Sequence, residues 1–130
     1  MKNRLGRVIL LVHDYDEAFA FYRDVFGCFA LHDSTTPEGQ RYLHVGFSPD
    51  DAFGIWLLQA TSGEQRQLVG RQSGGQPFLV VYTETFDELL ENLRQFNVPL
   101  LGEPVSSPGA RFVHCRDLYG NEIIVVQLIP

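Results

Sequence analysis

The stretch Val8–Phe19, with the sequence VILLVHDYDEAF, returns in altered form at Leu79–Leu90 as LVVYTETFDELL. In each copy, aliphatic and β-branched residues lead to a residue that can accept a hydrogen bond at a helix N-terminus, and a glutamate follows three positions later. This is the spacing of a capping box, at Asp14 to Glu17 in the first copy and Thr85 to Glu88 in the second. Each copy therefore predicts a strand followed by a helix.

Both predicted helices carry one apolar stripe at helical spacing. The stripes are Ala18, Phe19, Tyr22, Val25 and Phe26 in the first copy, and Phe86, Leu89, Leu90, Leu93 and Phe96 in the second. The copies also end alike, since Phe53–Gln59 (FGIWLLQ) matches Asn121–Gln127 (NEIIVVQ). Each helix is thus expected to bury one face against strands of its own copy.

Between the helix and the final strand, each copy has a further strand-like stretch and room for a shorter one. The longer stretches are Arg41–Phe47 and Ala110–Arg116, and the shorter ones lie near Phe29–His32 and Leu100–Leu101. The sequence therefore predicts an α+β fold of two tandem βαβββ modules, residues 1–60 and 77–130, in a single domain of residues 1–130. Residues 61–76 are rich in Gly, Gln and Ser and are predicted to form an exposed linking loop.

Composition excludes several classes of protein. The 130 residues are 45% hydrophobic and 20% charged, which is too apolar for a disordered chain. A net charge of −6 disfavours binding to nucleic acid, and the apolar run Val8–Val12 is too short to cross a membrane. Cys28 and Cys115 lack the spacing of a zinc site and are predicted to be buried, reduced thiols. We expect a cytoplasmic protein that binds neither nucleic acid nor membranes.

Three segments together resemble the vicinal oxygen chelate superfamily, which includes glyoxalase I, bleomycin-resistance proteins and extradiol dioxygenases. They are Val12–Asp14 at the end of the first strand, Ala20–Gly27 (AFYRDVFG) at the end of the first helix, and Asp117–Asn121 (DLYGN) before the last strand. The resemblance covers nearly the whole chain. It implies that the curved sheets of the two modules form a cleft and that the protein is a homodimer.

In metalloenzymes of this superfamily, side chains on the first and last strands of both modules hold a divalent ion in the cleft. The matching positions here carry Arg7, Trp56, Phe78 and Ile124. None of these side chains offers a lone pair to a hard cation. We therefore expect no metal or other cofactor at these positions, with a divalent metal at a displaced site as the alternative.

Strand alternation predicts which side chains would line the cleft if the four matching positions face it. Tyr42, His44, Tyr82, Phe112 and His114 would then join Arg7, Trp56 and Phe78 on this surface. The aromatic rings are expected to stack on a flat ligand, or simply to fill a cleft that holds no metal. Arg7 is expected to bind a carboxylate or phosphate of the ligand, or to form a surface ion pair.

Three hypotheses of function follow. The first is a small-molecule-binding protein of the bleomycin-resistance type, free of metal, that binds or sequesters an aromatic ligand, either neutral or anionic. The alternative is a glyoxalase-like or dioxygenase-like enzyme in which His44 and His114 act as acid and base or bind a displaced metal. A third possibility is an interaction domain with no ligand. His13, His32, Asp117 and Asn121 are interpreted as structural.

Overall fold

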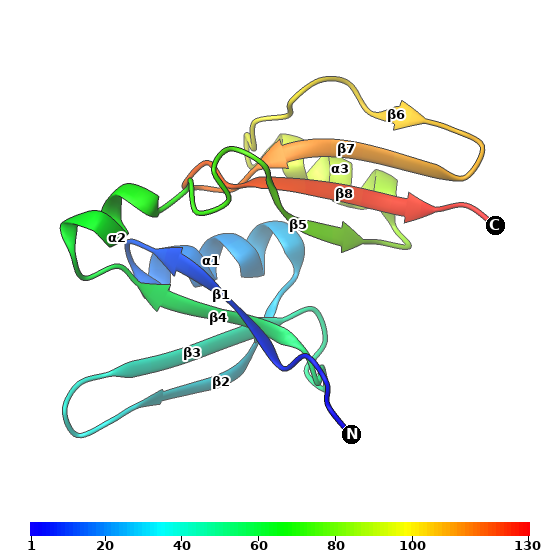
Figure 1. Cartoon of the computed structure of the whole chain (residues 1–130). Helices are drawn as coiled ribbons and strands as arrows, with labels where there is room; N and C mark the ends of the chain where they lie inside the picture. The colour runs from blue at the N-terminus through cyan, green and yellow to red at the C-terminus, as the bar shows by residue number, and fades with distance from the viewer. The chain divides into compact units, whose positions relative to one another are not determined.

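The computed structural model describes residues 1–130 and forms two compact units, Met1–Val69 and Gly70–Pro130. The first unit contains β1 (Arg7–Val12), α1 (Tyr15–Phe26), β2 (Phe29–Thr35), β3 (Arg41–Gly46), β4 (Gly54–Gln59) and α2 (Gly63–Leu68). The second contains β5 (Pro77–Tyr82), α3 (Phe86–Gln95), β6 (Val105–Ser106), β7 (Ala110–Arg116) and β8 (Glu122–Leu128). Figure 1 shows these elements along the chain. The predicted α+β fold with duplicated βαβββ modules is confirmed.

Each unit has one four-stranded sheet of the same topology. The strand orders are β1-β4-β3-β2 and β5-β8-β7-β6, so the first and last long strands of each module are neighbours. These neighbours, β1 with β4 and β5 with β8, are parallel, and the other pairs are antiparallel. The parallel pairs therefore place the residues matched to the metal positions on adjacent strands, Arg7 and Trp56 in the first unit and Phe78 and Ile124 in the second.

The core of the first unit lies between one face of the sheet and α1. The buried side chains are Leu10, Val12, Leu43, Val45, Ile55 and Leu57 from the sheet and Ala18, Tyr22 and Val25 from the helix. Fully burying one such large apolar side chain contributes about 1.5–3 kcal/mol. Residues of the opposite parity, including Ile9 at 43% exposure, are less covered. Burial therefore follows the predicted strand alternation.

The second unit is built in the same way around α3. Val81, Val113, Cys115, Ile123 and Val125 of the sheet are buried with Phe86, Leu90 and Leu93 of the helix. On the other face of the sheet, Val80 and Tyr82 of β5 are 52% and 69% exposed. Both cysteines are buried and free, as predicted, and burial raises the pKa of each thiol to about 12.

Only the first of the two predicted N-caps forms its capping hydrogen bond. Asp14 accepts a hydrogen bond from the backbone N–H of Glu17 at 2.8 Å, and α1 ends at Gly27 in the left-handed conformation. The prediction for Thr85 was wrong, because its side chain makes no capping bond. The backbone N–H of Phe86 instead donates to Gln127 Oε1 at 3.0 Å. A side chain distant in the sequence thus replaces the local cap.

The predicted loop at residues 61–76 contains a helix, α2. Ser62 Oγ accepts from the backbone N–H of Gln65, whose side-chain oxygen accepts from the backbone N–H of Thr61. This pair resembles a capping box, except that Gln65 bonds the residue before the N-cap, and it stabilises a single short helix. The boundary between the units falls after Val69, inside the predicted linker.

Two further details differ from the predictions. Leu100 forms only an isolated bridge to Cys115, and the short strand of the second unit is β6 at Val105–Ser106. Strand β3 ends at Gly46, one residue before the predicted end, and Phe47 is 43% exposed. The backbone N–H of Phe47 donates to the Asp51 carboxylate in a turn, which ends the strand alternation. No helix of the chain has the length and apolarity needed to cross a membrane.

Gly70 fixes the start of the second unit against the turn between β7 and β8. Its φ is +81°, and a Cβ atom there would lie 1.9 Å from the carbonyl oxygen of Tyr119. Gly74 also has a positive φ, +65°, but a Cβ atom there would meet nothing within 4 Å. Both glycines thus adopt a left-handed backbone conformation, but only Gly70 is also closely packed. Comparing alanine substitutions at the two positions therefore isolates the effect of the packing.

We predict that Gly70→Ala destabilises the protein by about 4 kcal/mol, because it adds a backbone clash to the cost of the left-handed conformation. Gly74→Ala is the matched control and should cost only about 1–2 kcal/mol. Urea unfolding monitored by circular dichroism measures both values. Equal losses for the two variants would contradict the packing of Gly70 against Tyr119.

Candidate functional site

Four side chains from four strands form one row across the sheet of the first unit. The register pairs His32 of β2 with His44 of β3, His44 with Trp56 of β4, and Trp56 with Ile9 of β1. Paired residues on neighbouring strands project from the same face of a sheet. The row therefore lies on the face that does not form the core with α1.

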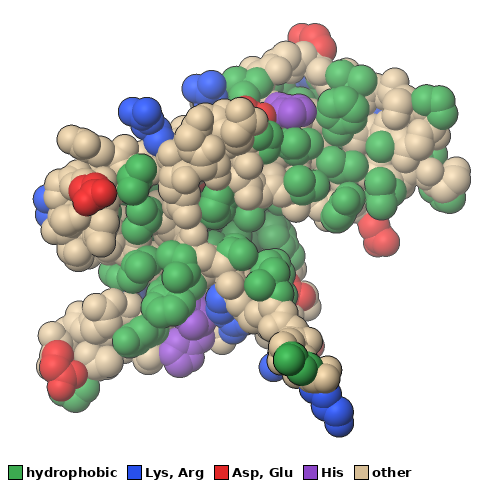
Figure 2. Space-filling model, in the orientation of Figure 1, with side chains coloured by type: hydrophobic (Ala, Val, Ile, Leu, Met, Phe, Trp, Pro, Cys, Tyr) green, Lys and Arg blue, Asp and Glu red, His purple; other side chains and the backbone are tan.

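Trp56 is the centre of an aromatic cluster on this face. Its ring centroid lies 5.6 Å from that of Tyr42 and 5.3 Å from that of His44. The ring of His32 lies 5.3 Å from that of His44. We call Tyr42, His44, Trp56 and His32 the ring cluster. Figure 2 shows histidine, basic and hydrophobic side chains together on the visible surface of this unit.

Arg7 borders the ring cluster and is held by three hydrogen bonds. Its Nε donates to His44 Nδ1 at 3.1 Å, and its Nη1 donates to the carbonyl oxygens of Gly6 at 2.8 Å and Ala52 at 3.2 Å. No carboxylate pairs with this guanidinium. The predicted surface ion pair is absent, and Nη2 is left with two N–H groups that bind nothing in the protein.

The bond from Arg7 fixes the tautomer of His44. Because Nδ1 accepts a hydrogen bond, the neutral ring carries its proton on Nε2. Burial, the nearby charge of Arg7 and His32 lower the pKa of His44 from its ordinary value of 6.5. Because the unfolded protein binds a proton at His44 more readily than the folded protein, acid destabilises the fold. The contribution of His44 to the free energy of unfolding is fully present above about pH 6.5 and is lost as the pH falls through the lower pKa of the folded state.

Two nitrogen atoms of the ring cluster have no hydrogen-bond partner although both are buried. They are Nε2 of His44 and Nε1 of Trp56. With the tautomer set by Arg7, both are N–H donors. Buried donors without an acceptor cost free energy and are rare in native proteins. Together with Arg7 Nη2, they make this face rich in donors and poor in acceptors.

The site residues predicted in the second unit form a separate set of contacts. His114 Nδ1 lies 2.7 Å from Glu122 Oε2, and the ring of Phe112 lies 5.9 Å from that of His114. Tyr82 is exposed on the edge strand β5 and contacts neither ring. Phe78 sits where the register between β5 and β8 shifts.

Sequence reasoning missed two members of these clusters. His32 was interpreted as structural, yet its ring joins the row next to His44. A register shift between Ala30 and His32 brings it there, and no local sequence signal marks such a shift. Glu122 was not named as a site residue, yet its carboxylate contacts His114.

Asp117 and Asn121 have the structural role that was predicted. Both are buried, and the Asn121 side chain donates to Asp117 Oδ2 at 2.9 Å. The other carboxylate oxygen of Asp117 accepts from the backbone N–H groups of Tyr119 and Asn121. These bonds hold the turn before β8.

The side chains at the family-matched metal positions do not fit a divalent ion. In the first unit they are a guanidinium and an indole, which present N–H donors, and in the second a phenyl and an aliphatic group. No group of three or more His, Cys, Asp or Glu side chains is arranged to hold a metal. The lone pair of His44 Nδ1 is occupied by the hydrogen bond from Arg7.

We predict that Arg7→Gln raises the pKa of His44 toward its ordinary value. The substitution removes a neighbouring positive charge and a hydrogen bond that favours the neutral ring. An NMR titration of the imidazole signals measures the change. Arg94→Gln, which removes an exposed arginine from α3, is the control and should leave the titration of His44 unaltered. An unchanged or lower pKa in Arg7→Gln would contradict this role of Arg7.

Known proteins are similar to this chain over nearly its whole length. An uncharacterized protein of Shewanella frigidimarina (strain NCIMB 400) is 31% identical over 130 residues, covering 98% of this chain and 96% of that protein. The crystal structure of UcmS2 is similar with a TM-score of 0.81 and 28% identity, covering 97% of this chain and 98% of that one. The structure of TnmS3, an antibiotic binding protein from Streptomyces sp. CB03234, is similar with a TM-score of 0.77 and 22% identity, covering 98% of both chains.

A sequence model of one family matches residues 4–125, nearly the full length of the chain. The two βαβββ units described above have the fold that this family and the similar structures share. The chain belongs to the Glyoxalase/Bleomycin resistance protein/Dioxygenase superfamily.

Proposed function

We propose that the protein binds a planar aromatic small molecule with an anionic oxygen group, and that it does so without a metal ion. The observation that carries the proposal is the ring cluster, with Trp56 between Tyr42 and His44, beside a guanidinium that no carboxylate neutralises. Aromatic rings give a flat ligand a large contact area. Arg7 Nη2 supplies charged donors for its oxygen atoms.

The unpartnered donors of the ring cluster favour a ligand over a cluster that merely fills space. A filled apolar site is most stable when every buried N–H has an acceptor. His44 Nε2 and Trp56 Nε1 have none. Both nitrogens are buried, so a ligand oxygen would accept from them, and offset their cost, only where binding shifts the rings that cover them.

The similar structures support a binding role of this kind. TnmS3 is an antibiotic binding protein, and its chain is similar to this one over 98% of its length. By analogy, we propose that the protein sequesters its ligand. A homodimer and a cytoplasmic location, which the family resemblance and the composition suggested, stay predictions.

The second candidate is an enzyme, and the His114–Glu122 pair favours it. A carboxylate 2.7 Å from an imidazole nitrogen can orient the ring for proton transfer. On the face beside Arg7, His44 has no carboxylate partner. Its Nδ1 accepts a hydrogen bond from Arg7 instead, which favours the neutral ring. We therefore place binding first and proton transfer at His114 second.

We predict that 2-naphthoate binds and that 2-naphthalenemethanol, which lacks the carboxylate, binds about tenfold more weakly. Arg7→Gln should weaken the binding of naphthoate about tenfold and leave the binding of the alcohol unchanged. Isothermal titration calorimetry measures all four affinities. Equal losses for both ligands in Arg7→Gln would show that Arg7 does not contact the carboxylate.

A second pair of variants tests whether the ligand contacts the rings of the ring cluster. Trp56→Leu should weaken the binding of both compounds, because it removes the central ring. Phe53→Leu changes an aromatic side chain that is 44% exposed and lies outside the ring cluster, so it should have no effect. Binding that survives Trp56→Leu unchanged would place the ligand elsewhere.

We predict that protein purified without chelator contains far less than one equivalent of metal per chain. Added Ni²⁺, Zn²⁺, Mn²⁺ or Fe²⁺ should not raise its melting temperature, since a ligand that binds the folded state stabilises it. Elemental analysis and thermal melts check both expectations. A metal that co-purifies in stoichiometric amount and is lost in His44→Ala or His114→Ala would favour the enzyme.

A further inference from the structure

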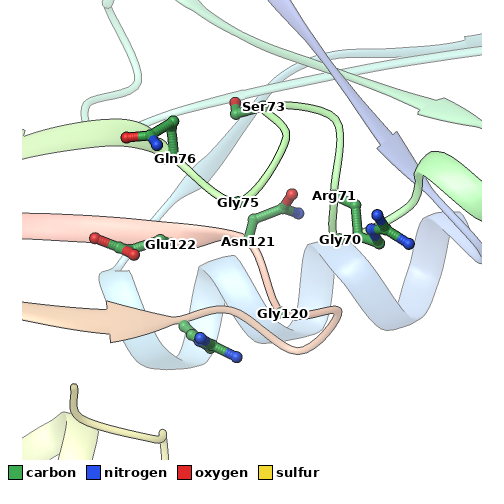
Figure 3. Close-up of a pocket in the computed structure, with 9 residues that line it drawn as sticks. Gly70, Arg71, Ser73, Gly75, Gln76, Gly120, Asn121 and Glu122 are labelled. Carbon is green, nitrogen blue, oxygen red and sulfur yellow. The ribbon is translucent and has the colours of Figure 1, made fainter.

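The second unit has a pocket of about 150 Å³ where the loop after Gly70 meets the ends of β7 and β8. Figure 3 shows its lining from the loop and from the turn that precedes β8. The lining residues are Gly70, Arg71, Ser73, Gly75, Gln76, Arg116, Gly120, Asn121 and Glu122. The ring cluster contributes nothing to it, so this pocket is independent of the proposed aromatic site.

The size and lining of the pocket restrict what it can hold. No apolar side chain lines it. Ligand sites for drug-sized molecules usually measure about 300–1,000 Å³ and are largely apolar. The pocket therefore suits a small polar group of a few heavy atoms and does not suit a fused aromatic ring.

Both arginines of the pocket lack an acidic partner. Three arginines of the chain form ion pairs, namely Arg23 with Asp24, Arg41 with Asp16 and Asp33, and Arg111 with Asp87. Arg71 and Arg116 form none, in a chain with sixteen acidic and ten basic residues. Two unpaired guanidinium groups at one small pocket create a local positive field on an acidic protein.

The contact between His114 and Glu122 explains why Arg116 is unpaired. Arg116 and Glu122 are cross-strand partners in the register of β7 and β8, where an ion pair is expected. The carboxylate of Glu122 instead lies 2.7 Å from His114 Nδ1. The acid nearest to Arg116 along the sheet is thus engaged, and the pocket retains two guanidinium groups against one carboxylate.

Neutral donors complete the lining. The hydroxyl of Ser73, the side-chain amide of Gln76 and the backbone N–H of Gly75 form no hydrogen bond within the protein. The loop that carries them is anchored, because Gly70 packs against the carbonyl of Tyr119. The opposite wall is held by the buried Asp117–Asn121 bonds. These neutral donors and Arg71 therefore come from the loop, whereas Arg116 lies at the end of β7 next to the turn against which the loop packs.

We propose that this pocket binds a phosphate-like oxyanion, either as a free ion or as the terminal group of a small molecule. Guanidinium groups donate paired hydrogen bonds to oxyanions of this kind, and hydroxyl, amide and backbone N–H groups fill the remaining acceptor positions. The site adds a second ligand class to the protein and does not depend on the proposed aromatic ligand.

Titration with inorganic phosphate, followed by isothermal titration calorimetry at low chloride concentration, tests this site. The expected result is saturable binding of one phosphate per chain that weakens as chloride is added. Arg71→Gln and Arg116→Gln should each weaken binding at least about threefold, and the double variant at least about tenfold. Binding of glycerol phosphate in place of phosphate would identify the terminal group of a larger molecule as the better ligand.

Arg94→Gln is the matched control, because it removes one exposed and unpaired arginine of the same unit outside the pocket. It should leave phosphate binding unchanged. A loss as large as that of Arg71→Gln would mean that net charge alone attracts phosphate and would overturn the proposal. So would the absence of saturable binding to the wild-type chain, provided that thermal melts show all variants folded.

Discussion

One helix can cover only one face of a four-stranded sheet, and this constraint determines where each unit can bind a ligand. A helix of 12 residues such as α1 is about 18 Å long, and four strands spaced about 4.8 Å apart span roughly 14 Å between their axes. In the first unit α1 packs on the face that carries Leu10, Leu43 and Leu57. The other face is not part of that core and can hold polar and aromatic side chains.

The features governed by strand and helix periodicity could be predicted from the sequence. Alternation along Val8–Val12 and Ile123–Val126 indicated which side chains are buried, and the repeat predicted the order of elements in both units. Features that depend on distant partners could not be predicted. Gln127 caps α3 in place of Thr85, and a register shift in β2 brings His32 to the row of Trp56.

The candidate site was predictable in part for the same reason. Alternation put Arg7, Tyr42, His44 and Trp56 on one face, and the structure brings these four into contact. The hydrogen bond from Arg7 to His44 could not be predicted from the sequence, because it joins β1 to β3 although β4 lies between them. Helix α2 was predictable in principle, because Ser62 and Gln65 have capping-box spacing that the glycine content of the segment obscured.

Arg7 stands at a position where metalloenzymes of the superfamily carry a metal ligand. Its guanidinium supplies a positive charge there without a metal ion. A metal ion would need lone pairs from the protein and would attract ligand oxygens, whereas a guanidinium needs none and attracts the same oxygens through N–H groups. The neutral His44 and the unpartnered Trp56 nitrogen extend this donor character across the face. These features support our proposal that the site binds an oxygen-bearing aromatic molecule, and the side chains at the matched positions offer a metal ion no lone pairs.

The most direct test of this account uses the indole N–H of Trp56, the single tryptophan of the chain. Its NMR signal can be followed in ¹H–¹⁵N spectra, together with intermolecular NOEs, while an aromatic carboxylate is added. The account predicts that the Trp56 indole signal shifts and shows NOEs to the ligand ring, with no shifts along α3. Shifts confined to α3, or to the β5 edge around Tyr82, with an unmoved indole signal would contradict it.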